Sequence, residues 1–294
     1  MSTDFSQARR YRVRHTTKYL YPQEVSYGQN VGYLVPLNQP GQERLAWRLQ
    51  VDPPIPDYQI YTDYLGNEVL YFAVERPHPY LAVTAESEVR LTPVAAPIQD
   101  MPWVKARQQL ATQAPHVRQF CFSSPHIPHP DLCHTLAQAA FPSTHTGLIA
   151  GCQHLMQLIY QDFCYQPHAT QVDTPLDEVM RNRQGVCQDF AHVAIAALRS
   201  LGLAAAYVSG YLETLPPQGQ EKLVGADASH AWFSLWVPHY GWLDFDPTNN
   251  IQPQGQHIWV ARGRDFSEVT PLKGVYLGLG VPELQVAVDV QRIE

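Results

Sequence analysis

Cys187 combines the residue type and the position most suited to covalent chemistry in this chain. It follows Gly185 and Val186 at the point where an apolar helical pattern begins. The first peptide N–H groups of a helix lack an intrahelical acceptor and carry the positive end of the helix dipole, which favours a thiolate, the nucleophilic form of cysteine. A cysteine on an apolar helix face can equally be a small buried side chain, so its position alone leaves both interpretations open.

A thiolate nucleophile needs a neighbouring base, and the base needs a third group that fixes its orientation. The segment 229–236 alternates as a strand does, and His230 falls on the face opposite to its apolar residues. The next segment, 241–248, carries Asp244 and Asp246 on one face. Pairing of the two strands would bring one aspartate beside His230, but the spacing does not decide which one. A strand histidine and an Asp-Pro turn are also common structural features.

Helices and strands must position these residues. Apolar residues recur at helical spacing over 190–201 and stop at Gly202, a natural residue after a helix end. Further helices are expected over 147–163 and after Thr174, the expected N-cap. Strand patterns follow over 203–212, 230–237, 242–245, 257–261 and 284–290. Helices followed by antiparallel strands predict an α+β domain over residues 146–294.

The first third of the chain has a different pattern. Residues 11–93 alternate mostly with a period of two, which predicts antiparallel strands, and Gly66 lies between two such runs where a hairpin turn needs a positive φ angle. Residues 8–95 are therefore expected to form an antiparallel β-sandwich-like domain. Prolines interrupt residues 96–145, which predicts a linker with short helices.

Composition limits the classes of function that remain. The 294 residues are 45% hydrophobic, enough for one large domain or two ordinary ones. Twenty basic residues against 27 acidic ones give a net charge of −7, which argues against a nucleic-acid partner. No apolar run predicts a membrane span, and the polar start of the chain lacks the pattern of a secretory signal. Five cysteines without a C-x-x-C pair indicate reduced thiols, so we expect a cytoplasmic protein whose oligomeric state is left undetermined.

Metal-ligand residue types occur together at His126, His129, Cys133 and His134. Their spacing matches no usual zinc pattern, and prolines break the segment, so a solvated loop is expected. No Gly-rich phosphate loop or dinucleotide fingerprint occurs either. The sequence therefore predicts neither a metal ion nor a cofactor. His192, on the helix that begins near the nucleophile, is expected to be structural.

Three blocks resemble the bacterial branch of the transglutaminase-like cysteine enzymes. They are Arg183–His192, Ser229–Trp232 and Gly241–Asn249. Further segments resemble that family and the β domain that usually precedes its core: 163–170, 263–266, 15–21 and 63–67. The resemblance covers nearly the whole chain, with the blocks in the family's order. It implies a papain-like/transglutaminase-like α+β core in which helices pack on an antiparallel sheet.

By position in these blocks, the resemblance implies a catalytic triad. Cys187 is the nucleophile, His230 is the base and later the acid, and Asp246, rather than Asp244, orients His230. Two positions depart from the family's usual pattern: Ser234 stands where relatives often carry an acidic residue, and Asp244 where they often carry a small or apolar one. Neither departure touches the implied triad.

The reaction that the resemblance implies is acyl transfer from an amide bond of a peptide or protein substrate, through a thioester on Cys187. The Cys187 main-chain N–H is the natural first donor to the oxyanion. Tyr165, Gln188 and Trp232 are candidates for further oxyanion or substrate contacts, from their place in the motifs. Hydrolysis is slightly favoured over transfer to an amine, because nothing indicates the calcium dependence of animal cross-linking relatives. A non-catalytic binding module with the same fold is the second hypothesis.

Overall fold

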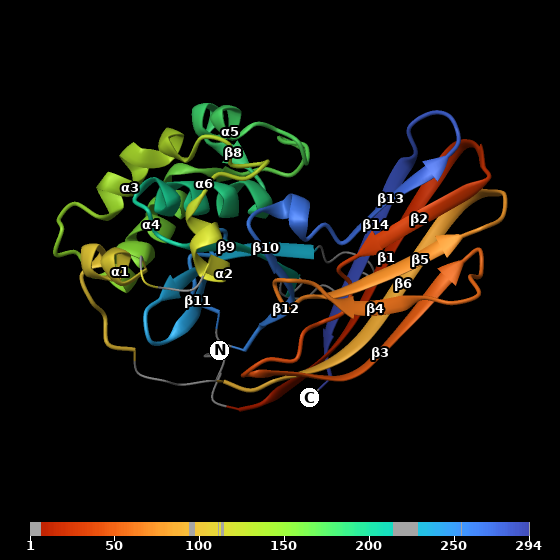
Figure 1. Cartoon of the computed structure of the whole chain (residues 1–294), viewed down its shortest axis with the longest axis horizontal. Coiled ribbons are helices and arrows are strands. Elements are labelled where there is room, and N and C mark those ends of the chain that lie inside the picture. The colour runs from red at the N-terminus through yellow and green to blue at the C-terminus, as the bar shows by residue number, and fades with distance from the viewer. Residues whose placement is uncertain are drawn as a thin grey trace, which may run out of the picture.

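The computed structural model describes residues 7–93, 98–110, 112, 115–213, 229–253 and 255–293. Figure 1 shows a helix-covered part, coloured from yellow-green to teal, beside a part made of long strands, coloured red, orange and dark blue. The architecture confirms the predicted α+β class.

The long strands form two four-stranded antiparallel sheets. Their orders are β14-β1-β6-β3 and β13-β2-β5-β4. The bounds are β1 (Arg9–Val25), β2 (Tyr27–Gly32), β3 (Gln42–Asp52), β4 (Gln59–Thr62), β5 (Glu68–Val74), β6 (His78–Leu91), β13 (Leu272–Leu277) and β14 (Glu283–Arg292). Alternate residues of β5 and β6, including Phe72 and Val83, meet in a shared buried core. Gly66, between β4 and β5, has a φ of +87°, which explains why a glycine is needed in that turn.

The last two strands belong to these sheets and not to the C-terminal core. β14 pairs with β1 from Tyr11↔Arg292 to Leu20↔Glu283, and β13 pairs with β2. The sequence pattern groups residues 284–290 with the strands of the predicted α+β domain, whereas in the structure this strand pairs with β1 of the N-terminal sheets. Alternation predicts that a segment is a strand but does not identify its partner, and the free edge of β1 accepts this strand. The predicted boundary at residues 95 and 96 lies outside the described residues.

The predicted linker does contain short helices, but it is packed into the helical layer. Its elements are α1 (Trp103–Leu110), α2 (Pro115–Arg118), η1 (Gln119–Cys121), η2 (Pro130–Cys133) and α3 (His134–Ala140). Trp103, Cys133 and Leu136 are buried in the same core as the longer helices. This segment is therefore part of the core's packing.

The remaining helices cover a four-stranded antiparallel sheet of order β11-β10-β9-β12. The elements are α4 (Leu148–Asp162), β7 (Cys164–Tyr165), α5 (Leu176–Asn182), β8 (Gln184–Gly185), α6 (Cys187–Ser200), β9 (Ala205–Leu212), β10 (Ser229–Val237), β11 (Gly241–Phe245), β12 (His257–Gly263) and η3 (Phe266–Glu268). Helix α6 is buried on all sides from Asp189 to Arg199, because helices α3, α4 and α5 contact it opposite the sheet. Thr174 is not the N-cap of α5; Pro175 takes that position, and the Thr174 hydroxyl accepts from the Gln171 N–H.

Two amide side chains of the N-terminal sheets close the outer edge of the core sheet. Gln42 accepts from the Trp259 N–H and donates to the Trp259 carbonyl, both at 2.8 Å. Asn67 pairs in the same way with the Arg262 main chain, again at 2.8 Å. Because β12 is an edge strand, these bonds satisfy main-chain groups that a neighbouring strand would otherwise pair.

All five cysteines are free thiols, and Cys152 is fully buried in the core, as its place in the sequence predicts. Within the described residues, no helix has both the length and the apolar character needed to cross a membrane.

Arg199, near the end of α6, is the residue whose replacement best tests how this helix is joined to the segments around it. The residue is 4% exposed, and its guanidinium donates to the Phe120, Ala205 and Arg264 carbonyls and to Ser124 Oγ. Burial lowers its pKa to about 10, although Asp265 acts in the opposite direction. Arg199→Met should lower the free energy of unfolding by about 3–5 kcal/mol, because four buried acceptors lose their donor. Urea denaturation measures the loss.

The matched control is Arg181→Met. Arg181 is an exposed residue of α5 whose guanidinium pairs with Asp177 at 3.0 Å. Its replacement should change the free energy of unfolding by less than about 0.5 kcal/mol. Equal losses in the two variants would contradict the assigned role of Arg199.

Candidate active site

Cys187 is the first residue of α6, and hydrogen bonds between nearby residues fix that end of the helix. Val186 is extended, and its N–H donates to Asp189 Oδ2 at 2.8 Å. Thr170 Oγ1 donates to the same oxygen at 2.6 Å. A Cβ on Gly185 would lie 2.6 Å from Asp189 Oδ2, so only glycine allows this approach. The run Gly185-Val186-Cys187 therefore delivers a half-buried thiol at a capped helix start.

His230 lies between the thiol and a carboxylate. Its Nε2 donates to Asp246 Oδ2 at 2.8 Å, and the side chain of Cys187 acts on the same ring. Burial lowers the pKa of His230, but the bonds to Asp246 and Cys187 outweigh it and raise the pKa to about 10. The imidazolium is therefore the form held between the two partners at neutral pH.

Strand register determines which aspartate reaches His230. Ser234 lies opposite Asp244 in the β10–β11 pairing, so Asp246 comes two residues nearer to His230 along the neighbouring strand. The structure brings together Cys187, His230 and Asp246, the set that the family resemblance implies. Asp244 is engaged elsewhere.

Asp246 is a fully buried carboxylate with five hydrogen-bond donors. Oδ1 accepts from the N–H groups of Thr248 (3.0 Å) and Asn249 (3.2 Å). Oδ2 accepts from His230, from Asn249 Nδ2 (2.7 Å) and from His257 Nε2 (2.9 Å). Burial raises its pKa, but the bonds from the two histidines dominate and hold the pKa well below the usual range. Asp246 is therefore ionised.

Sequence reasoning missed His257. It begins β12 and was visible only as the first residue of a predicted strand, with no motif to connect it to Asp246. Burial lowers its pKa in spite of the neighbouring carboxylate, so the ring is neutral at pH 7. The imidazole ring packs edge-on against Trp232, with the ring centres 5.0 Å apart.

The ligating atoms of His230, Asp246 and His257 all lie within 4.8 Å of one another, and their types suit a transition metal. Hydrogen bonding already accounts for this arrangement, because both Nε2 atoms donate to the same carboxylate oxygen. The prediction that the protein uses no metal stays a prediction.

The other predicted contacts have different placements. Trp232 is fully buried, with its ring stacked on His230 at 6.0 Å, so it forms a wall behind the imidazole. Gly210 makes room for it, since an added Cβ would lie 2.5 Å from the indole. Tyr165 is 50% exposed; burial and then the charge of Cys187 raise the pKa of its hydroxyl. Gln188 donates to the Val172 carbonyl at 3.0 Å, so its amide is engaged outside the triad.

The two departures from the family pattern are cross-strand partners. Ser234 donates to Asp244, which also accepts from Trp259 Nε1 at 2.5 Å. Burial raises the pKa of Asp244 to about 6, although its bond to Ser234 and the charge of Arg262 lower it. These groups form a buried polar cluster separate from the triad. His192 is structural, as expected: its ring stacks on His126, and it accepts from the Phe266 N–H.

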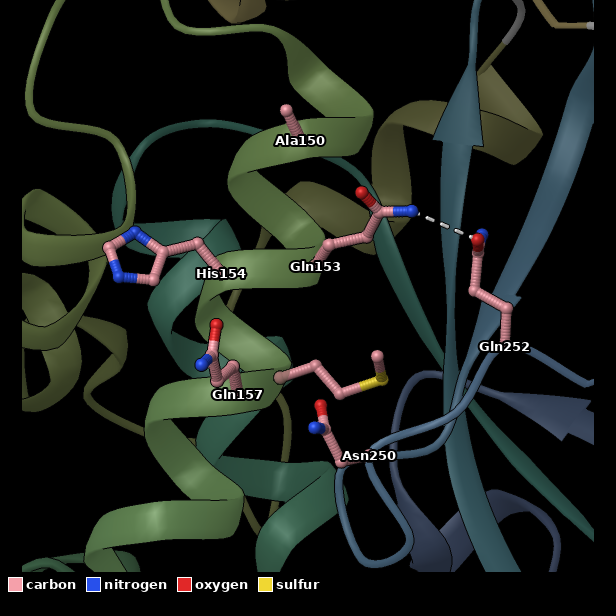
Figure 2. Close-up of a pocket in the computed structure, with 7 residues that line it drawn as sticks. Ala150, Gln153, His154, Gln157, Asn250 and Gln252 are labelled. Atoms are coloured by element: carbon pink, nitrogen blue, oxygen red, sulfur yellow. Dashed lines mark hydrogen bonds between the residues drawn. The ribbon is translucent and has the colours of Figure 1, made fainter.

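A polar hollow of about 520 Å³ lies between α4 and the loop after β11 (Figure 2). Gln153 donates across it to Gln252 at 3.0 Å, and Asn250 forms part of its wall. No member of the triad lines it. We therefore do not assign the reacting bond to this hollow.

Comparison with known proteins finds a family match for each of two separate parts of the chain. Residues 11–90 match the bacterial transglutaminase-like N-terminal region, and residues 136–247, which contain the triad, match the transglutaminase-like superfamily. An uncharacterized protein of Mycobacterium tuberculosis is 38% identical over 311 residues, covering 100% of this chain and 96% of that protein.

Two further proteins are similar over different extents. A protein-glutamine gamma-glutamyltransferase of Pseudomonas aeruginosa is 35% identical over 133 residues, which cover 42% of this chain and 20% of that protein. The crystal structure of a candidate cysteine protease from Cytophaga hutchinsonii shares the fold with a TM-score of 0.77, at 20% identity and with 98% of this chain and 92% of that chain covered. The chain belongs to the transglutaminase-like superfamily, with a transglutaminase-like core preceded by the bacterial N-terminal region.

Proposed function

We propose that the protein is a cysteine-dependent acyl-transfer enzyme that acts on amide bonds of peptide or protein substrates. The observation that carries the proposal is the position of His230, whose Nε2 donates to ionised Asp246 at 2.8 Å and whose ring is also acted on by the Cys187 side chain. A thiol paired with an imidazolium at a helix start has the arrangement that activates a cysteine nucleophile.

The geometry supports a two-step reaction. The Cys187 sulfur attacks the amide carbonyl carbon, and the main-chain N–H of Cys187, at the first position of α6, is the candidate donor to the developing oxyanion. His230 gives its proton to the departing amine, which leaves a thioester on Cys187. His230 then takes a proton from water or an amine as that nucleophile attacks the thioester, and the thiolate is released. Asp246 stays ionised throughout and stabilises the imidazolium.

For the second step, attack on the thioester, we assign water as the first-choice nucleophile, so the reaction is hydrolysis. Cys187 is only half-buried and Tyr165 beside it is exposed, so water reaches this side of the site in the described part of the chain. Transfer to an amine is the second candidate, supported by the likeness to a gamma-glutamyltransferase over 133 residues.

Selective alkylation tests the nucleophile. Iodoacetamide at pH 7 should modify Cys187 roughly tenfold faster than exposed Cys164, and His230→Ala should remove that advantage. Burial raises the pKa of the thiols of Cys121 and Cys133 to about 11 and about 12 and also raises that of fully buried Cys152, so these three should react slowest. Peptide mass spectrometry gives each rate. Equal rates at Cys187 and Cys164 would support the non-catalytic binding module instead.

Paired aspartate variants test which carboxylate serves the triad. Asp246→Asn removes the charge that raises the pKa of His230, so alkylation of Cys187 at pH 7 should slow roughly tenfold. Asp244→Asn should change the rate by less than about twofold, because its carboxylate bonds Ser234 and Trp259. The reverse order of effects would assign the orienting role to Asp244.

Incubation of the protein with casein and a dansylated amine distinguishes hydrolysis from amine transfer in the second step. We expect new N-termini in casein, with little incorporated label, and neither product with Cys187→Ala. Fluorescence of the protein band measures transfer, and N-terminal labelling measures cleavage. Strong labelling without cleavage would replace hydrolysis with amine transfer, and no Cys187-dependent product on any of a panel of peptide amides would refute the proposed function.

A further inference from the structure

His257 contributes to the site without reaching the solvent. It is 4% exposed, and its Nε2 lies 2.9 Å from Asp246 Oδ2. The same oxygen accepts the hydrogen bond from His230 Nε2. The carboxylate is ionised, so Nε2 must carry the proton and donate. His230 and His257 therefore hold one oxygen from two different strands, β10 and β12.

Within the described residues, the bond to Asp246 is the one hydrogen bond of the His257 ring. Nδ1 is buried and has no hydrogen-bond partner among the residues that the structure describes. The ionisable groups that act on His257 are Asp246 and His230. A buried polar atom left unpaired is costly, so an ordinary structural role would be served better by an apolar ring.

The strand that carries His257 is held by the N-terminal domain. Two residues along β12, Trp259 exchanges both main-chain hydrogen bonds with buried Gln42, and Arg262 does the same with buried Asn67. These four bonds fix the edge of the sheet at the position from which His257 reaches the carboxylate. A continuous path of bonds thus connects the N-terminal sheets with Asp246.

We propose that His257 is a positioning residue, held on β12 by the N-terminal domain, that fixes the Asp246 carboxylate for His230. The inference rests on the proposed function, because it concerns the same triad. The neutral Nε2–H favours the more negative state of the triad and prevents the carboxylate from turning away from His230. Loss of this donor should make the triad as a whole easier to protonate and lower the reactivity of Cys187.

The test is the pH profile of Cys187 alkylation by iodoacetamide in the full chain. His257→Asn and His257→Phe both remove a donor at the Nε2 position, whereas His257→Gln can place an amide N–H there. The first two variants should move the acid limb of the profile upward by about half a pH unit and lower the plateau rate roughly tenfold. His257→Gln should restore both values to within about twofold and 0.2 pH unit of the wild type.

The control is His78→Phe, which replaces a buried histidine of the N-terminal sheets. It should lower the melting temperature without moving the acid limb, as a merely structural effect would. Two variants lose the contact, so one that fails to fold leaves the other to decide. Unchanged profiles in the contact-losing variants, or no rescue by His257→Gln, would overturn the positioning role while wild-type selectivity for Cys187 leaves the proposed function intact. If wild-type Cys187 shows no selectivity, the proposed function itself fails.

Discussion

The ionised carboxylate of Asp246 is the constraint on which the rest of the site depends. A charge taken out of water is expensive unless hydrogen bonds replace its solvation. Five donors surround this carboxylate, from the turn after β11 and from His230 and His257. Strands β10, β11 and β12 must therefore keep one arrangement relative to each other across the sheet, because a shift of any of them would leave a buried charge without its donors.

The nucleophile is placed by a second, independent device. Asp189 ties the start of α6 to Val186 and Thr170, and Gly185 provides the space for that carboxylate. Helix and sheet then meet with the thiol against the imidazole. The site thus has one rigid support on the helical side and another on the sheet side, with the reacting pair between them.

The N-terminal region is joined to the core sheet by hydrogen bonds and by the return of the chain. Gln42 and Asn67 occupy main-chain groups at the edge of the core sheet, and β13 and β14 return from the core to complete the N-terminal sheets. The chain therefore crosses between the two parts twice. Such an arrangement lets sheets distant from the thiol influence the strand that carries His257.

Local patterns in the sequence determined the elements and the chemistry they carry. The helix start at Cys187, the strand face of His230 and the two aspartates on one face follow from side-chain periodicity and from the properties of helix ends, which need only neighbouring residues. Strand pairing depends on residues far apart in the chain, so periodicity and spacing left Asp244 and Asp246 open, and only the resemblance to a family implied Asp246. The tertiary structure supplies the physical reason, because Asp244 bonds Ser234 while Asp246 meets His230. For the same reason, neither the partner of β14 nor the bond from His257 to Asp246 could be predicted, since no local pattern records which distant group a strand residue will face.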